Sequence, residues 1–166
     1  MTPERAKKLA KSPAVQGNMS IEDIVKADWK RNFEGRGFTL DDARMAVAQH
    51  AQSGEVARLR NTLFLLPDIQ GDEERVEFHT VTADPFEVYS TLLLMFALAL
   101  AEKTDIQYLF SYINDKAIYR RLRRVLGDAL DVEDSPNEDK GRYMATIDLP
   151  LLYDNARRHA TRGETA

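Results

Sequence analysis

The chain has 166 residues, a mass of 18.9 kDa and a formal net charge of −4, and its length is that of one domain. Hydrophobic residues make up 43% of the sequence, so the chain can bury a core, and disorder of the whole chain is excluded. No cysteine is present, which excludes disulfides, thiol catalysis and thiolate metal sites. The negative charge argues against bulk affinity for nucleic acid, though not against a local basic patch.

The longest apolar run, at residues 92–101, is about half as long as a membrane span needs to be. The first residues are polar and basic, with no apolar stretch of the kind found in a secretory signal. We therefore expect neither a membrane span nor secretion through a signal peptide.

The N-terminal part is expected to be helical after a basic arm. Residues 1–19 are basic and interrupted by a proline and a glycine, so we expect them to lie outside the domain. One helix is expected to begin after Ser20 and another after Thr39, because an aspartate follows each three residues later, as in a capping box. Gly35 and Gly54 would end these helices.

Two strands are expected next. Residues 59–65 alternate between apolar and polar side chains, which indicates a strand that ends at Pro67. After a polar turn, residues 75–82 alternate again and place Glu77 and His79 on one face. Together the two strands are expected to form an antiparallel hairpin.

A buried helix and a second crossover strand are expected in the middle of the chain. Asp84 and Pro85 are suited to the N-cap and the first helical position ahead of residues 86–103. This segment is apolar on nearly all sides, as a buried helix is. A β-prone run at 106–113 follows, and the order strand, helix, strand indicates a right-handed crossover between parallel strands.

Four shorter elements are expected after the crossover. Residues 114–126 have the pattern of an amphipathic helix that ends at a glycine. Residues 129–132 and 142–149 are strand candidates, and a short final helix is expected from Pro150 to about His159.

The order of these elements indicates an α+β or mixed α/β fold, in which helices flank one central mixed sheet. The domain is expected to span residues 20–160. The basic arm, 1–19, would precede it, and a polar tail, 161–166, would follow.

Few residues are candidates for chemistry. The histidines, His50, His79 and His159, have no ligand-type spacing, so no metal site is expected. Glu77 and His79 lie within a strand and are conceivable general bases, although such side chains are more often structural. No P-loop or G-x-G-x-x-G motif is present, and residues 72–126 contain no glycine.

The strongest charge feature is a group of cations on the helix expected at 114–126, namely Lys116, Arg120, Arg121, Arg123 and Arg124. One interpretation is a solvated face that pairs with nearby acidic loops. The other is a surface for an anionic partner, which could be an acidic protein, a phosphate-bearing ligand or nucleic acid. No aromatic residues form a stacking platform among the arginines, so single-stranded nucleic acid is the weakest of these choices.

From Glu55 onward, the order of expected elements resembles that of GNAT-type N-acyltransferases. In that family a hairpin, here residues 56–66, leads into a central strand, a helix, a parallel strand, a second helix and a closing hairpin. The sequence Asn114-Asp-Lys-Ala117 is similar to the family's N-x-x-A motif, and Leu126-Gly127 resembles the Leu-Gly that ends the second helix. The resemblance implies acetyl-CoA as cofactor, with Asn114 beside it and Tyr119 near the place of the family's general-acid tyrosine.

The departures from the family pattern fall on its chemistry. Family members hold the diphosphate of acyl-CoA with a Q/R-x-x-G-x-G/A loop before the buried helix, but this chain has Ala83-Asp-Pro-Phe-Glu-Val88 there. The proline removes an amide donor, and Asp84 and Glu87 would repel phosphates. The family's tyrosine position, four residues before the glycine, is Arg123, so Tyr119 is out of register.

These departures favour a scaffold that has lost its acyltransferase site. Degenerate GNAT-like domains are similar to virion proteins of short-tailed bacteriophages. That similarity implies a non-enzymatic structural or interaction protein of the virion tail, neck or interior, which binds other protein subunits of an assembly and no cofactor. On this basis the protein is expected in the cytoplasm or in the virion.

Two alternatives stay open. The first is an atypical N-acyltransferase that uses acetyl-CoA, with Glu77 or His79 as its base. The second is a small module that binds nucleic acid or a regulator through the basic helix.

Overall fold

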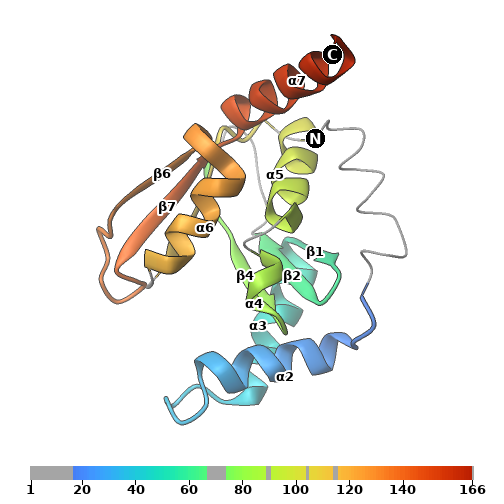
Figure 1. Cartoon of the computed structure of the whole chain (residues 1–166). Helices are drawn as coiled ribbons and strands as arrows, with labels where there is room; N and C mark the ends of the chain where they lie inside the picture. Colours follow the sequence, from blue (N-terminus) through green and yellow to red (C-terminus); the bar gives the residue numbers. More distant parts are fainter. Residues whose placement is uncertain (1–16, 67–73, 89–90, 104, 114–115, 166) are drawn as a thin grey trace.

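The computed structural model describes residues 17–66, 74–88, 91–103, 105–113 and 116–165, apart from the side chains of 103, 116 and 159–165. The helices are α2 (Ile21–Asn32), α3 (Leu40–Ser53), α4 (Pro85–Val88), α5 (Thr91–Lys103), α6 (Lys116–Leu126) and α7 (Leu149–Thr165). The strands are β1 (Glu55–Leu59), β2 (Thr62–Leu66), β3 (Arg75–Glu77), β4 (His79–Thr82), β5 (Tyr108–Ile113), β6 (Leu130–Asp134) and β7 (Tyr143–Asp148). Figure 1 shows their arrangement.

The two N-terminal helices begin at the residues that the sequence predicts. Oγ of Ser20 accepts a hydrogen bond from the N–H of Asp23 at 3.1 Å. Thr39 and Asp42 form the reciprocal hydrogen bonds of a capping box. Each cap satisfies backbone N–H groups that the first turn of a helix leaves without partners, so both expected helix starts are confirmed.

The strands form two sheets that share one stretch of chain. β1, β2 and β4 form a three-stranded sheet, and β3, β5, β7 and β6 form a four-stranded sheet in that order. β3 and β4 are consecutive parts of the expected strand at 75–82 and are separated only by Phe78. The chain pairs with β5 before Phe78 and with β2 after it. The expected central sheet is therefore divided where this strand changes partner.

The expected pairings of this strand are confirmed. β4 is antiparallel to β2, and β3 is parallel to β5 across the connection through α4 and α5. β6 and β7 form the antiparallel pair that closes the larger sheet. The mixed α/β fold class is confirmed, with the element order that the resemblance to GNAT-type N-acyltransferases implies.

The expectation of one strand over residues 59–65 is wrong, whereas the hairpin implied at 56–66 is present. The chain reverses at Arg60 and Asn61, so β1 pairs with β2. Arg60 has a φ of 53°, in the left-handed region that few residues other than glycine adopt. The guanidinium of Arg58 supports the turn by donating to the carbonyl of Arg60 at 2.8 Å. Every residue of β2 is buried, so alternation along β2 does not reveal the turn.

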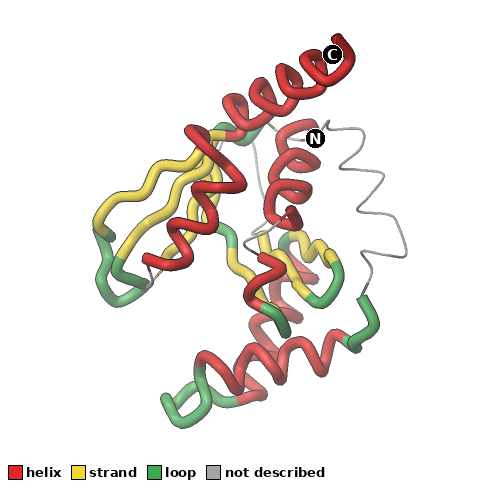
Figure 2. Tube along the Cα trace, viewed as in Figure 1, coloured by secondary structure: helices red, strands yellow, loops and turns green. Residues whose placement is uncertain are grey.

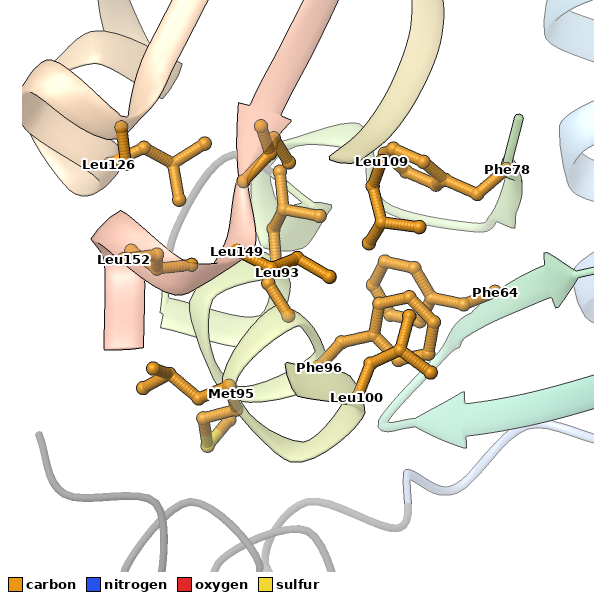
Figure 3. Packing of buried hydrophobic residues seen from close by; sticks show 14 of the residues in the cluster. Phe64, Phe78, Leu93, Met95, Phe96, Leu100, Leu109, Leu126, Leu149 and Leu152 are labelled. Atoms are coloured by element: carbon orange, nitrogen blue, oxygen red, sulfur yellow. The ribbon is translucent and has the colours of Figure 1, made fainter. Parts of the chain in front are cut away.

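The main core lies between α5 and the two sheets (Figure 3). Phe96 of α5 stacks on Phe64 of β2 with their ring centroids 4.3 Å apart, and Leu98 is fully buried. The helix expected at 86–103 is thus buried as predicted, and it consists of α4 and α5, with residues 89–90 outside the described part. Among the described helices, none is both long and apolar enough to cross a membrane.

A second, smaller core lies on the opposite face of β2. Leu63 and Leu65 alternate with Phe64 along the strand, and they pack against Ile24 and Val25 of α2. α2 and α3 therefore cover one face of the three-stranded sheet, while α5 covers the other (Figures 1 and 2).

Both ends of the folded part extend beyond the expected elements. α7 continues to Thr165 instead of ending near His159, because no proline follows Pro150 of its first turn and a single glycine costs a helix only about 1 kcal/mol. At the other end, the N–H of Met19 donates to Oδ1 of Asn61 at 3.2 Å, so the chain already contacts the β1–β2 turn before residue 20. Residues 1–16 of the expected arm lie outside the described part.

We predict that Leu98→Ala lowers the free energy of unfolding by about 2–5 kcal/mol, because it leaves a cavity in the main core. Urea unfolding of the full chain would measure this change. Met45→Ala is the matched control, since Met45 is 59% exposed and its truncation should change stability by less than about 0.5 kcal/mol. A similar loss in both variants would contradict the burial of α5.

Candidate functional site

A cleft opens where β4 and β5 separate. The N–H of Phe78 donates to the carbonyl of Phe110 at 3.0 Å, and after this bond β4 pairs with β2 while β5 pairs with β7. The cleft has a volume of about 290 Å³. The residues that line it include Asn32, Thr80, Ser111, Tyr112, Ile118 and Leu122.

The backbone of Thr80 presents a hydrogen-bond donor to this cleft. The N–H of Phe78 points toward β5, and the N–H of Thr82 leaves the sheet to donate to Oδ1 of Asp28 at 3.1 Å. Alternate residues of a strand direct their N–H groups to the same side. The N–H of Thr80 lies between these two and therefore faces the cleft.

A second hollow, the helical pocket, lies between α2, α3 and β4 and has a volume of about 260 Å³. Most of its lining is apolar, and the lining includes Val25, Phe33, Phe38, Ala46, Val47 and Val81. Thr80 lines both the cleft and the helical pocket. The two hollows therefore approach each other at this residue.

His79 lines the helical pocket and lies beside three titratable groups. Its Nε2 is 3.8 Å from Oε1 of Glu77, whose Oε2 binds Nζ of Lys140 at 3.1 Å. Its ring centroid is 6.0 Å from that of His50. Loss of solvation lowers the pKa of His79, and the Glu77 carboxylate opposes this shift, whereas His50 and Lys140 reinforce it. The ring is therefore mainly neutral near pH 7 and can accept a proton.

Asp28 is a buried carboxylate that lines the same pocket. It is 7% exposed, and its Oδ1 accepts hydrogen bonds from the N–H of Thr82, from Arg31 at 3.2 Å and from Asn32 at 3.3 Å. Burial raises the pKa of Asp28, and the bond from Thr82 and the charge of Arg31 oppose this shift. Within the described ranges, no residue donates to its other oxygen, Oδ2.

The start of α4 is occupied by the chain's own carboxylate. Oδ1 of Asp84 accepts from the N–H of Phe86 at 3.0 Å, and the carbonyl of Asp84 accepts from the N–H of Glu87 at 3.1 Å. Pro85 has no N–H to offer. The N–H groups of Phe86 and Glu87 are therefore already used within the chain.

The described arginines of α6, namely Arg120, Arg121, Arg123 and Arg124, are all exposed. Within the part of the chain that the structure describes, none of them forms an ion pair, so the expected pairing with acidic loops is not found. The guanidinium of Arg121 lies 4.4 Å from the ring centroid of Phe86, which joins α6 to α4. The side chain of Lys116 lies outside the described part.

The structure describes only one of the two residues that the family resemblance implies. Asn114 lies outside the described residues. Tyr119 is half-buried, and its hydroxyl accepts a hydrogen bond from Arg123 at 3.0 Å. Among the described residues that line the cleft or the helical pocket, Tyr119 does not appear.

The structure brings Glu77 and His79, which the sequence analysis selected, beside His50, which it did not select as a site. Asp28, which it also did not select, lines the same pocket as the two histidines. His50 belongs to α3, so only the packing of α3 against the sheet places it near His79. Asp28 gives one signal in the sequence, because it interrupts the apolar stripe of α2. Among the described residues, no group of three or more histidine and carboxylate side chains could hold a metal ion.

Comparison with protein-family models finds no match, and no curated protein matches the chain. The structure is similar to that of an uncharacterized protein from Bacillus halodurans, with a TM-score of 0.53, 9% identity, and coverage of 82% of this chain and 84% of that chain. It is less similar to a spermidine N-acetyltransferase from Vibrio cholerae, with a TM-score of 0.48, 12% identity, and coverage of 81% and 92%. For a GNAT-family acetyltransferase from Bacillus anthracis, the TM-score is 0.45 and the identity 15%, with coverage of 86% of this chain and 90% of that chain. The first likeness shows a shared fold, and the two weaker ones carry no argument about activity.

We predict that NMR titration of the His79 ring gives a pKa below the ordinary value of 6.5. Glu77→Gln should lower the pKa further, because the carboxylate favours the charged ring. Lys140→Met should raise it, because removal of the ammonium relieves repulsion. A pKa at or above 6.5 in the unaltered protein, or a rise in Glu77→Gln, would contradict the described cluster.

Proposed function

We propose that this protein transfers an acyl group from a thioester to an amine, with His79 as the general base. The observation that carries the proposal is the position of a mainly neutral histidine on the strand where the cleft and the helical pocket meet. A thioester in the cleft and an amine in the helical pocket would approach each other beside Thr80.

The residues supply two parts of this reaction. The ring of His79 takes the proton from the ammonium of the acceptor, and the free amine nitrogen attacks the thioester carbonyl carbon. A C–N bond forms and the C–S bond breaks. The nitrogen loses its second proton as the amide forms, and the leaving sulfur takes up that proton and departs as a thiol. The N–H of Thr80, which faces the cleft, donates to the carbonyl oxygen as negative charge develops on it.

Acetyl-CoA, the cofactor that the resemblance implies, does not fit the residues at the start of α4. The N–H groups of Phe86 and Glu87 already donate to Asp84, and the carboxylate of Asp84 would repel a diphosphate. The carboxylate of Glu87 is paired with Arg60 at 3.3 Å. The proposal therefore takes the donor to be a thioester that is bound by its acyl and thiol portions rather than by a diphosphate.

We predict a dissociation constant above about 100 μM for acetyl-CoA, which corresponds to less than about 5.5 kcal/mol of binding free energy. The reason is that the N–H groups of Phe86 and Glu87 already donate to Asp84. Isothermal titration calorimetry would measure the constant. Tighter binding would show that the cofactor finds a different phosphate site.

We predict that the protein acetylates a primary amine from S-acetyl-N-acetylcysteamine, a thioester without phosphates, and that His79→Gln lowers the rate at least 100-fold. The size follows from the usual contribution of a general base. Product formation by mass spectrometry would measure the rate. In the pH–rate profile, the loss of activity on the acid side should lie below pH 6.5, because the pKa of His79 is lowered.

Asp41→Asn is the control for this experiment, since Asp41 is exposed on α3 and its variant should keep the rate. An equal loss in both variants would point to general destabilisation. An unchanged rate in His79→Gln would remove His79 from the reaction.

A binding role without catalysis is the second candidate, and the exposed arginines of α6 favour it. Four cations without ion pairs in the described part suit an acidic surface of a partner subunit. Under this reading, no thioester supports turnover, and Arg120→Glu with Arg124→Glu abolishes salt-dependent binding of poly-glutamate. A virion component would be one protein of this kind.

A further inference from the structure

Helix α6 presents an arginine face, which consists of Arg120, Arg121, Arg123 and Arg124, all exposed. The helix contains no aspartate or glutamate. A helix face that is simply solvated often mixes charges of both signs, so that residues three or four apart attract one another. Arg120 and Arg124 are one turn apart and repel each other instead. Among the described residues, neither of them has an ion-pair partner.

The strand that follows α6 carries the opposite charge. β6 is the last strand in the order β3, β5, β7, β6, so one of its edges is open among the described strands. Exposed carboxylates lie on β6 and on its connection to β7, and they form a carboxylate edge of Asp131, Glu133, Asp134, Glu138 and Asp139. In the part of the chain that the structure describes, none of these carboxylates forms an ion pair.

The sheet keeps the two charged groups apart within one molecule. Leu130 of β6 belongs to the main core together with Leu122 and Leu126 of α6, so α6 lies on the face of the sheet to which Leu130 points (Figure 1). Neighbouring residues of a strand point to opposite faces, so Asp131 and Glu133 point away from α6. The arginine face points away from the core on the other side. The two groups therefore do not neutralise each other within one copy.

The surroundings of the arginine face favour a protein as its partner. Phe86 of α4 is 60% exposed, and the guanidinium of Arg121 lies 4.4 Å from the centroid of its ring. Arginine and phenylalanine are enriched at protein interfaces, whereas lysine is depleted. The net charge of −4 opposes binding of a large polyanion such as nucleic acid. An acidic protein surface fits these features, and the carboxylate edge of a second copy is one.

We infer that copies of this protein associate head to tail, with the arginine face of one copy against the carboxylate edge of the next. Because the two surfaces lie on opposite faces of one sheet, a copy that binds one neighbour through its arginines keeps its carboxylates available for another. Contacts of this kind are heterologous, and they build rings or filaments rather than closed dimers. The inference goes beyond the proposed acyl transfer and does not depend on it.

The chemistry of both surfaces suits a contact between side chains. Charged residues on an edge strand discourage another strand from pairing with its backbone. A guanidinium can donate two parallel hydrogen bonds to one carboxylate, which gives the contact a defined geometry as well as attraction. Since the charges are exposed before contact, the association should depend strongly on ionic strength.

Sedimentation velocity of the full chain at two salt concentrations is the first test. At about 200 μM protein and about 50 mM NaCl, where the Debye length exceeds about 10 Å, we expect assemblies of three or more copies of the 18.9 kDa chain. About 500 mM NaCl should weaken association at least tenfold, because it screens the attraction between the two surfaces.

The direction of the salt effect is informative. Copies with a net charge of −4 repel one another overall, and salt relieves that repulsion. An association that did not use opposite charges would therefore grow stronger with salt. A chain that stays monomeric at low salt, one that stops at a dimer, or assemblies that grow with salt would each overturn the inference.

Two charge-neutralised variants locate the contact. Arg120→Gln with Arg124→Gln changes the arginine face, and Asp131→Asn with Glu133→Gln changes the carboxylate edge. Each variant should self-associate at least tenfold more weakly than the unaltered protein. The second variant also lowers the overall repulsion between copies, so its loss of association would not follow from net charge. Mixed in equal amounts, the two should form a 1:1 dimer that grows no further, because each keeps only one intact surface.

Lys26→Gln with Lys30→Gln is the matched control. These lysines of α2 are exposed, have the same spacing along a helix as Arg120 and Arg124, and change the net charge by the same amount. This control should assemble as the unaltered protein does. Equal association of the arginine variant and the lysine control would overturn the inference. So would a mixture of the two charge-neutralised variants that stays monomeric while the unaltered protein assembles.

Discussion

The cleft exists because one strand stops pairing with β5 at Phe78 and continues beside β2. If β4 remained paired with β5 along its whole length, a continuous ladder would occupy the cleft. The change leaves backbone groups on the facing edges of β4 and β5 without sheet partners, which is costly unless other groups satisfy them. Asp28 does so for the N–H of Thr82, and the N–H of Thr80, which faces the cleft, is the group that we propose a ligand to use.

Local patterns in the sequence predicted most of the fold, because they report interactions between neighbours along the chain. The caps at Ser20 and Thr39 are satisfied within one helical turn, and the apolar sequence of α5 requires burial whatever its neighbours are. The N-cap role of Asp84 at the start of α4 was also predictable, since its carboxylate accepts from the N–H of Phe86, two residues along the chain. The turn at Arg60 was not, because it depends on an arginine in a backbone conformation that sequence patterns do not assign to arginine.

The candidate site was predictable only in part. Alternation along residues 75–82 placed Glu77 and His79 on one face, but the neighbours of that face come from α2, α3 and the β6–β7 connection. The contact between His50 and His79 depends on how α3 packs, and the hydrogen bond from Thr82 to Asp28 joins a helix to a strand distant in sequence. An aspartate in an apolar stripe signals a buried partner, yet the sequence does not say which backbone group the partner is.

Gly17 has a consequence for how this sequence can vary. It has a φ of 74°, and a Cβ at this position would lie 2.4 Å from the carbonyl carbon and oxygen of Arg60. The hairpin turn at Arg60 and the chain entering α2 therefore fit together only with a glycine at position 17. Homologues that carry another residue there must have a different β1–β2 turn, so the two segments should change together in evolution. Correlated substitutions at position 17 and in the β1–β2 turn would therefore report the contact between these two segments.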